Sequence, residues 1–350
     1  MSHAFPVGHL HVGPGQPAFI IAEAGVNHNG DVQLARDLVD AAWKAGASAV
    51  KFQTFKAEQL VTADAPKASY ALETTDNQES FLDMLRRLEL DEAAHRELLE
   101  RSGERELVFM STPFDEESAD FLNALPVPIF KIPSPEITNI PLLRHVARMG
   151  KPVILSTGMA TLAEVETAVE TLEREGTRDL IILHCVSNYP ARPEDTNLRV
   201  LETLRAAFGY PVGLSDHTAG VEISVAAVAL GACVIEKHYT LDRNLPGPDH
   251  QASLEPDELK LLVHSIRNVE AAMGTGRKAP VAREANTAAV ARKSLVTAQA
   301  LPAGTVLTEA MIAIRRPGTG LPPAMREQLV GRTLRVDLPA GALLTLDHIQ

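Results

Sequence analysis

Eight short apolar runs alternate with helix-like stretches over residues 18–273, and this alternation constrains the fold more than any other feature. Between the runs, apolar residues recur three and four positions apart, as in Val165, Ala168, Val169 and Leu172, which is typical of amphipathic helices. Eight strands, each followed by a helix, predict an α/β fold of the (β/α)8 TIM barrel type. An open doubly wound sheet is the alternative, although it often has a glycine-rich first turn, which this chain lacks. The predicted strands are 19–24, 49–53, 107–110, 129–132, 153–155, 180–185, 212–214 and 234–237.

The pattern changes after residue 273, which predicts a second domain. We expect the barrel over 1–273, a linker over 274–292, and a small β-rich domain over 293–350. In the small domain the sequence Leu-Pro-Ala-Gly occurs at 301–304 and again at 338–341, which indicates repeated turns between short strands. About 60 residues bury only a marginal core. We therefore expect this domain to pack against its own barrel or a second subunit.

Composition and charge exclude several classes of protein. The formal net charge of −12 argues against a nucleic-acid-binding surface. No apolar run reaches the roughly 18 residues that a membrane-spanning helix needs, and the first residues lack an export-signal pattern. Cys185 and Cys233 are the only cysteines, and both lie in apolar runs, as expected for buried thiols in a reducing compartment. These features predict a cytoplasmic globular protein.

Polar side chains stand at the C-terminal ends of the predicted strands, where barrel enzymes carry out their chemistry. Lysines and hydroxyls on successive strands offer donors that converge on a polyanion, such as a phosphate ester that also bears a carboxylate. A single Ser or Thr at such a position often caps the next helix instead, but their recurrence favours a binding site. The residues are Lys51, Thr112, Lys131, Ser134, Ser156 and Ser215.

Histidines and carboxylates complete the predicted site. His217 and His238 end adjacent strands, so they are either hydrogen-bonding core histidines or a pair of ligands for a divalent ion that also binds substrate oxygens. Glu136 follows the hydroxyls, where it would serve as a general base or cap a helix. Asp249 lies in a polar loop suited to sugar hydroxyls, or in an ordinary turn. The residues alone thus predict a barrel enzyme with an anion site and a metal.

Seven sequence strings, most of them at the ends of predicted strands, resemble in their order the N-acetylneuraminate (sialic acid) synthase family. The tail resembles the family's antifreeze-like (SAF) domain, with Ile314-Arg-Arg-Pro-Gly-Thr-Gly320 as its most telling part. The resemblance implies a TIM barrel followed by a small β-rich SAF domain. The seven strings are Ile21-Ala-Glu-Ala-Gly-Val-Asn-His-Asn-Gly30, Val50-Lys-Phe-Gln53, Phe130-Lys-Ile-Pro-Ser134, Ile154-Leu-Ser-Thr-Gly-Met159, Gly213-Leu-Ser-Asp-His-Thr218, Glu236-Lys-His238 and Gly247-Pro-Asp-His-Gln-Ala-Ser253.

The resemblance implies a metal-dependent N-acetylneuraminate synthase. Such an enzyme condenses phosphoenolpyruvate with open-chain N-acetylmannosamine and water to give N-acetylneuraminate and phosphate. His217 and His238 would bind Mn²⁺ or Mg²⁺, which polarises the aldehyde oxygen. Glu136 would handle the proton of the attacking water, and Glu23 would act both in catalysis and in sugar binding. The implied phosphoenolpyruvate ligands are Lys51, Thr112, Lys131, Ser134, Ser156 and Ser215, and the implied sugar ligands are Glu23, Gln53, Tyr189, Asp249 and Arg316.

Arg316 would come from the small domain of a partner subunit, which implies a domain-swapped homodimer; Arg315 beside it is the alternative by one residue. Family members often have an asparagine two residues before the tyrosine of strand six. Here that position is Ser187, so either Ser187 replaces it or Asn188 does in a shifted loop.

Three alternatives to this activity remain open. Related synthases make legionaminic or pseudaminic acid, and the 250–253 string is closer to the sialic and legionaminic branches. A legionaminic acid synthase would use 2,4-diacetamido-2,4,6-trideoxymannose. A condensation on a phosphorylated sugar would need a second basic cluster at the strand ends, which the sequence lacks. A non-catalytic sugar-binding barrel would have no need of Lys51, His217 and His238, and all three are present.

Overall fold

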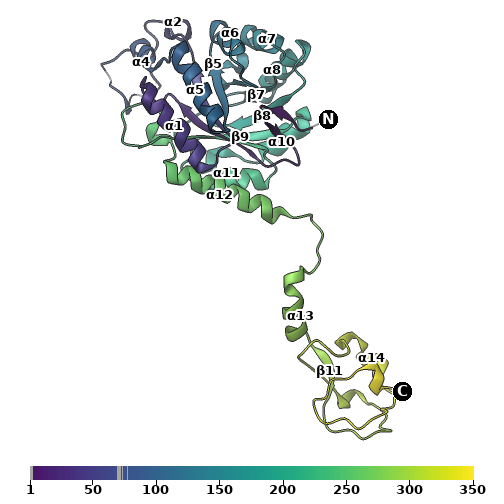
Figure 1. Ribbon diagram of the computed structural model, residues 1–350. Helices are drawn as coiled ribbons and strands as arrows, with labels where there is room; N and C mark the ends of the chain where they lie inside the picture. Colours follow the sequence, from purple (N-terminus) through teal and green to yellow (C-terminus); the bar gives the residue numbers. More distant parts are fainter. Residues whose placement is uncertain (1–2, 69–71, 73, 77) are drawn as a thin grey trace. The chain divides into compact units, whose positions relative to one another are not determined.

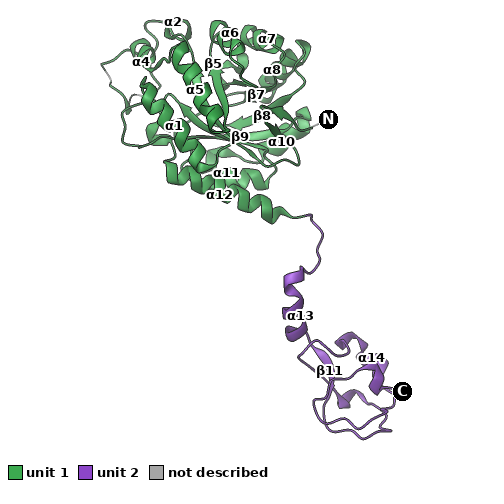
Figure 2. Ribbon diagram, viewed as in Figure 1, with its two compact units in different colours: residues 1–274 green, residues 275–350 purple. Residues whose placement is uncertain are grey.

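Eight parallel strands form the centre of the larger of two compact units. The structure is a computed structural model that describes residues 3–68, 72, 74–76 and 78–350 (Figure 1). The chain divides into unit 1, residues 1–274, and unit 2, residues 275–350 (Figure 2). Among the described residues, no helix has the length and apolar character that crossing a bilayer requires.

The strands of unit 1 follow one another around a barrel. In the sheet their order is β5-β4-β3-β10-β9-β8-β7-β6, and β5 and β6, at its two ends, are neighbours. Each of the eight predicted strands is confirmed, with ends that agree within three residues, because the apolar runs and the turn residues between them are local signals. The strands are β3 (Phe19–Gly25), β4 (Ala49–Thr54), β5 (Val108–Pro113), β6 (Phe130–Ile132), β7 (Val153–Ser156), β8 (Leu180–Cys185), β9 (Val212–Asp216) and β10 (Val234–His238).

Helices lie around the strands (Figure 1). Side chains cap the starts of several helices. At α8, Thr161 and Glu164 form a capping box, and at α1, α6 and α7 free backbone amides donate to Asp31, Asp115 and Asn139. Among the residues that the structure describes, the helices of unit 1 include α1 (Val32–Ala45), α2 (Ala57–Leu60), α4 (Phe81–Leu88), α5 (Glu92–Glu104), α6 (Glu116–Ala124), η1 (Ser134–Thr138), α7 (Ile140–Arg148), α8 (Leu162–Arg174), α9 (Pro193–Thr196), α10 (Val200–Phe208), α11 (Glu222–Ala229), η2 (His250–Ala252) and α12 (Pro256–Met273).

Two apolar clusters pack against the strands of the barrel, one on their outer face and one on their inner face. Outward-facing residues such as Val50 and Phe52 belong to the large cluster that they form with the helices. Inward-facing residues such as Ala49 belong to a second cluster, together with Phe5 of a hairpin that the sequence analysis did not predict. This hairpin consists of β1 (Phe5–Val7) and β2 (Leu10–Val12), which are too short to show a clear alternation. Further along the strands the inward positions are polar.

Unit 2 is β-rich, as predicted, and has its own core. The antiparallel strands are β11 (Ser294–Thr297) and β12 (Ile312–Arg315). The two Leu-Pro-Ala-Gly turns pair with each other, because Leu301 and Leu338 exchange backbone hydrogen bonds of 2.9 and 2.8 Å. The segment predicted as a linker contains two short helices, η3 (Ala282–Glu284) and α13 (Ala285–Ala291); the remaining helices are η4 (Glu309–Met311), η5 (Pro323–Met325), α14 (Arg326–Leu329) and η6 (Leu346–His348).

Candidate active site

Charged and hydroxyl side chains fill the barrel interior at the C-terminal ends of the strands. They occupy the inward positions that follow the apolar ones, since side chains alternate along each strand. All of them are at most 5% exposed, so they face one another and not bulk water. The set brings together five of the six predicted anion ligands, and the members are Glu23, Lys51, Thr112, Lys131, Ser156, Ser215 and Glu236.

Two lysines and two glutamates form one connected network in this set. Lys51 Nζ lies 2.7 Å from Glu23 Oε2 and 3.8 Å from Glu236 Oε2, and it donates to Thr112 Oγ1 at 2.8 Å. Lys131 Nζ lies 3.3 Å from Glu236 Oε1, which also accepts from Ser215 Oγ at 2.8 Å. Equal numbers of buried cations and anions compensate one another, which buried charges require.

The two glutamates of this network differ in their ionisation. Burial raises the pKa of Glu23 to about 7, although Lys51 opposes the rise. Burial alone would raise the pKa of Glu236 too, but the ammonium groups of Lys131 and Lys51 together with the Ser215 hydroxyl lower it to about 2. Near neutral pH, therefore, Glu236 is the fixed anion, whereas Glu23 readily gains or loses a proton.

The two predicted metal-binding histidines lie side by side. The ring centroids of His217 and His238 are 5.4 Å apart, and the Tyr189 ring lies 4.1 Å from the first and 5.5 Å from the second. His217 Nδ1 is 2.8 Å from the carbonyl oxygen of Val186, which leaves Nε2 for another partner. Among the described residues, His238 Nδ1 is buried without a hydrogen-bond partner. Tyr189 thus shares the site with both imidazoles.

This pair fits a divalent cation that takes its other ligands from substrate and water. An orphaned imidazole nitrogen beside a second imidazole offers two soft-to-borderline nitrogen ligands. In the part of the chain that the structure describes, no group of three His, Cys, Asp or Glu side chains could enclose a metal. The site is therefore unsuited to a closed structural zinc ion and leaves coordination positions open.

Ser134, on η1, lies close to Ser187 and Cys185 beside the backbone of Gly158, and we call these three side chains the wall of the site. Its Oγ accepts from the Gly158 amide at 3.0 Å. A Cβ atom added to Gly158 would lie 2.2 Å from Ser187 Oγ, 2.8 Å from Ser134 Oγ and 3.1 Å from Cys185 Sγ. Only glycine therefore lets these three side chains approach the backbone. Of the two alternatives left open by the sequence, Ser187 joins this wall, whereas Asn188 is exposed.

Asp249 enters the site from the loop after β10. Its backbone carbonyl accepts from Ser253 Oγ at 2.7 Å, and Ser253 Oγ in turn accepts from Asn27 Nδ2 at 2.9 Å, which ties this loop to the one after β3. Burial raises the pKa of the Asp249 carboxyl to about 6, with His217 opposing the rise. The Asp249 side chain is buried, and its place in the sugar site stays a prediction.

Gln53 also joins the site, and Glu136 has other partners. A Cβ added to Gly25 would lie 3.4 Å from both Gln53 Nε2 and Glu23 Oε1, so these two side chains flank that glycine. Glu136 is half-buried on η1, accepts from Asn139 Nδ2 at 2.6 Å, and its pKa is raised by burial and by Asp115. Its role as a general base stays a prediction.

Arg316 and Arg315 belong to unit 2. Arg315 ends β12 and pairs in register with Ser294, and Arg316 follows it directly; both are exposed. The proposed reach of Arg316 into a partner's site stays a prediction.

Two members of the site received no functional role from the sequence. Glu236 lies two residues before His238 on β10, and this spacing places both on the inner face. Cys185, at the end of β8, lies 3.8 Å from His217 Nδ1; burial raises its pKa, but His217 and Lys131 outweigh burial and lower it to about 7. The period of two along each strand was the signal for both residues.

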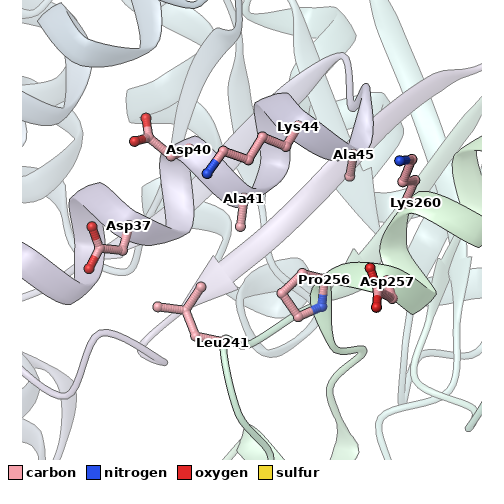
Figure 3. A pocket seen from close by; sticks show the side chains of 9 residues that line it. All are labelled: Asp37, Asp40, Ala41, Lys44, Ala45, Leu241, Pro256, Asp257 and Lys260. Atoms are coloured by element: carbon pink, nitrogen blue, oxygen red, sulfur yellow. The ribbon is translucent and has the colours of Figure 1, made fainter.

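A surface groove of about 450 Å³ lies apart from these residues, between α1 and the beginning of α12 (Figure 3). None of the predicted site residues line it. Its charged side chains have both signs, so the groove selects neither anions nor cations. The charged residues are Asp37, Asp40, Lys44, Asp257 and Lys260.

Comparison with known proteins finds one family for each part of the chain, and sugar-acid synthases among the relatives. The sequence profile of the NeuB family matches residues 38–278, and that of the SAF domain matches residues 292–350. The chain is 49% identical over 315 residues to N,N'-diacetyllegionaminic acid synthase of Campylobacter jejuni, which covers 89% of this chain and 94% of that protein. The enzyme of the same name from Legionella pneumophila is 46% identical over 342 residues, or 97% of this chain and 96% of that protein.

A solved structure is similar to this chain in both fold and sequence. The crystal structure of the N-acetylneuraminic acid synthetase from Leptospira borgpetersenii in complex with citrate matches with a TM-score of 0.73 and 39% identity, over 82% of this chain and 95% of that chain. The barrel with its polar end and the match of both domains lead to one conclusion: the chain belongs to the NeuB family and carries a C-terminal SAF domain.

Proposed function

We propose that this protein is a sugar-acid synthase that condenses phosphoenolpyruvate with the open-chain aldehyde of an acetamido sugar and releases phosphate. The observation that carries the proposal is the buried network of Lys51 and Lys131 with hydroxyls, next to the adjacent imidazoles of His217 and His238. The network supplies donors for a phosphate and a carboxylate, and the imidazoles supply a place where a carbonyl can be polarised.

Lys51 and Lys131, with the hydroxyls of the wall, would hold phosphoenolpyruvate. In the free protein each lysine is within ion-pair distance of a glutamate. Because the pKa of Glu23 is about 7, this side chain can take a proton when a polyanion enters, and Lys51 then turns its charge to the ligand. Glu236 stays ionised and keeps the two lysines oriented.

His217 and His238 would hold Mn²⁺ or Mg²⁺, which supplies Lewis-acid polarisation of the aldehyde oxygen when it is bound. C3 of phosphoenolpyruvate forms a bond to the aldehyde carbon, water adds at C2, and the C2–O bond to phosphate breaks. Glu136 is the candidate acceptor of the proton that the water loses. Gln53, Tyr189 and Asp249 would bind the sugar. Arg316 of a second subunit would complete the site in a domain-swapped homodimer.

The comparisons favour one of the two sugars that the sequence left open. The relatives that are 49% and 46% identical are N,N'-diacetyllegionaminic acid synthases, so they do not support the N-acetylneuraminate product that we first expected. We therefore propose 2,4-diacetamido-2,4,6-trideoxymannose as the preferred substrate, with N-acetylmannosamine as the second candidate.

A product assay tests both parts of the proposal. The full chain is incubated with phosphoenolpyruvate, Mn²⁺ and each sugar in turn; released phosphate is measured, and the product is identified by mass. We expect phosphate release that stops with a chelator, in His217→Ala, and in Lys131→Met. Lys260→Met is the matched control, because Lys260 is an exposed lysine on α12, and its activity should equal that of the unmodified chain. No phosphate release with either sugar would contradict the proposal.

A further inference from the structure

A buried ion pair links β9 and β10 on the outer face of the barrel, away from the site. Asp216 Oδ2 lies 2.9 Å from Lys237 Nζ, and the two side chains are 0% and 1% exposed. They are direct neighbours in the parallel ladder, since Lys237 pairs in register with Asp216. The pair therefore joins two neighbouring strands close to their C-terminal ends.

Further hydrogen bonds surround this pair. The Asp216 carboxylate accepts from the Thr218 amide at 2.9 Å, from Thr218 Oγ1 at 2.7 Å and from Ser224 Oγ at 2.6 Å. Lys237 Nζ also donates to the Thr218 carbonyl oxygen at 2.5 Å. Asp216, Thr218 and Lys237 thus form a closed ring of contacts, which we name the outer clamp.

The outer clamp includes the chain neighbours of both imidazoles. His217 lies between Asp216 and Thr218, and His238 directly follows Lys237. Because side chains alternate along a strand, the clamp residues point outward where the histidines point inward. Any shift of β9 against β10 at this level changes the separation of the two rings.

Stability alone does not explain charges at this position. One step earlier on the same face, the cross-strand neighbours are Ile235 and Leu214, and both belong to the apolar cluster between strands and helices. A buried ion pair contributes no more to stability than well-packed apolar residues of similar volume, and its best-attested use is to specify register. The charges therefore replace an apolar contact at the one level that carries the histidines.

We propose that the outer clamp positions the two histidines that would bind the metal ion. In this proposal, Asp216 and Lys237 fix the separation and orientation of His217 and His238. This inference rests on the proposed function, because it assigns the two imidazoles to a divalent ion. The clamp residues touch neither substrate nor ion. They act through the strand ends, in the way that residues behind a metal ligand set the ligand's geometry.

The test replaces the ion pair with an apolar pair, Asp216→Leu/Lys237→Met, in the full chain. Mn²⁺ alone is the probe, and its binding is measured by titration calorimetry without substrates, next to thermal unfolding and steady-state kinetics. We expect the Kd for Mn²⁺ to rise about 10- to 100-fold. The midpoint of thermal unfolding should stay close to that of the unmodified chain, because no buried charge is left unpaired.

Two matched variants separate positioning from general stability. Leu214→Ala removes packing from the apolar step of the same face, and it should lower stability without changing the Kd for Mn²⁺. Thr218→Val keeps the ion pair and the side-chain shape but removes one hydrogen bond to Asp216, so it should weaken Mn²⁺ binding about fivefold even where the double variant does not fold.

Unchanged Mn²⁺ affinity in a folded double variant, or in Thr218→Val, would overturn the clamp. Phosphate release by the unmodified chain is measured first, so that the two failures are distinguishable. Without that activity, or without Mn²⁺ binding by the unmodified chain, the proposed function fails and the clamp fails with it.

Discussion

Replacing Glu23 by Gln tests the central feature of the site, a carboxyl that is buried beside a lysine and yet holds its proton near neutral pH. Gln has nearly the shape of protonated Glu and cannot ionise. The variant therefore removes the ionisation of Glu23 and little else. Glu236→Gln is the matched control, because it changes the other glutamate of the same network, whose pKa moves the opposite way.

The size of the effect follows from the pKa of about 7, compared with an ordinary value of 4.5. Between these two pH values the folded state binds more protons than the unfolded state, so the free energy of unfolding falls as pH rises. The fall amounts to about 3 kcal/mol for Glu23. The free energy of unfolding of Glu23→Gln should not fall in this way. Between pH 4.5 and pH 8 the variant should therefore gain about 3 kcal/mol of stability relative to the unmodified chain.

Glu236 should behave in the opposite way. Its pKa of about 2 lies below the ordinary 4.5, so its ionisation stabilises the fold above pH 4.5, and this contribution is lost as pH falls through 2. At pH 7, Glu236→Gln should be less stable than the unmodified chain by about 3 kcal/mol. The two isosteric changes thus have opposite signs in one network.

Urea unfolding at several pH values, in the presence of a chelator, measures both effects. Trp43 is the only tryptophan and lies in α1, so its fluorescence reports on unit 1 without a contribution from unit 2. Stability curves of Glu23→Gln and the unmodified chain that run parallel from pH 4.5 to pH 8 would refute the reasoning. So would a gain in stability at pH 7 for Glu236→Gln.

Three further predictions concern the wall of the site and unit 2. Gly158→Ala should raise KM for phosphoenolpyruvate about tenfold, because the added Cβ displaces the Ser134 and Ser187 hydroxyls. Overpacking should lower the free energy of unfolding in the urea assay by about 1–3 kcal/mol. An unchanged KM would contradict a role of these hydroxyls in binding phosphoenolpyruvate. A chain that ends at Gly274 should show the urea transition of unit 1 and no phosphate release; full activity would remove unit 2 from the mechanism. Arg316→Ala in the full chain should lower kcat/KM about 100-fold, as expected for a lost hydrogen bond to a charged donor, whereas Arg315→Ala should not.

Much of the fold and the direction of the site residues were predictable from sequence because both depend on local patterns. The apolar runs identified all eight strands, and the polar residues at the strand ends included Lys51 and Lys131, which the alternation along a strand directs inward. The same alternation holds for Glu236, which was noted at a strand end but received no role. Its importance comes from ion pairs with two lysines on two other strands, and such cross-barrel contacts have no signal in one sequence.

Other details depend on how segments distant in sequence meet. Ser187 lies against Gly158, which belongs to the preceding βα unit, whereas Asn188 is exposed; which of the two binds substrate stays a prediction. The hairpin β1–β2 was missed because three-residue strands carry no readable period, although their apolar residues complete the inner core. Glu136 was predicted from its place after the hydroxyls, yet its hydrogen bond is to Asn139, a contact within its own turn.

The placement of apolar and polar residues along each strand has a consequence for how this protein tolerates change. On β5 the inward positions Val108 and Met110 belong to the inner apolar cluster, and the next inward residue, Thr112, binds Lys51 in the site. The apolar residues that stabilise the barrel and the polar residues of the site thus lie toward opposite ends of the same strand, and the change from one to the other takes two residues. Burial already lowers the pKa of Lys131, and a barrel that separated them less would surround its lysines with apolar side chains and lower their pKa values further. Substitutions in the inner apolar cluster, at the end of the barrel that the β1–β2 hairpin contacts, should therefore change the free energy of unfolding of unit 1. They should leave the anion site unchanged, because that site lies at the opposite ends of the strands.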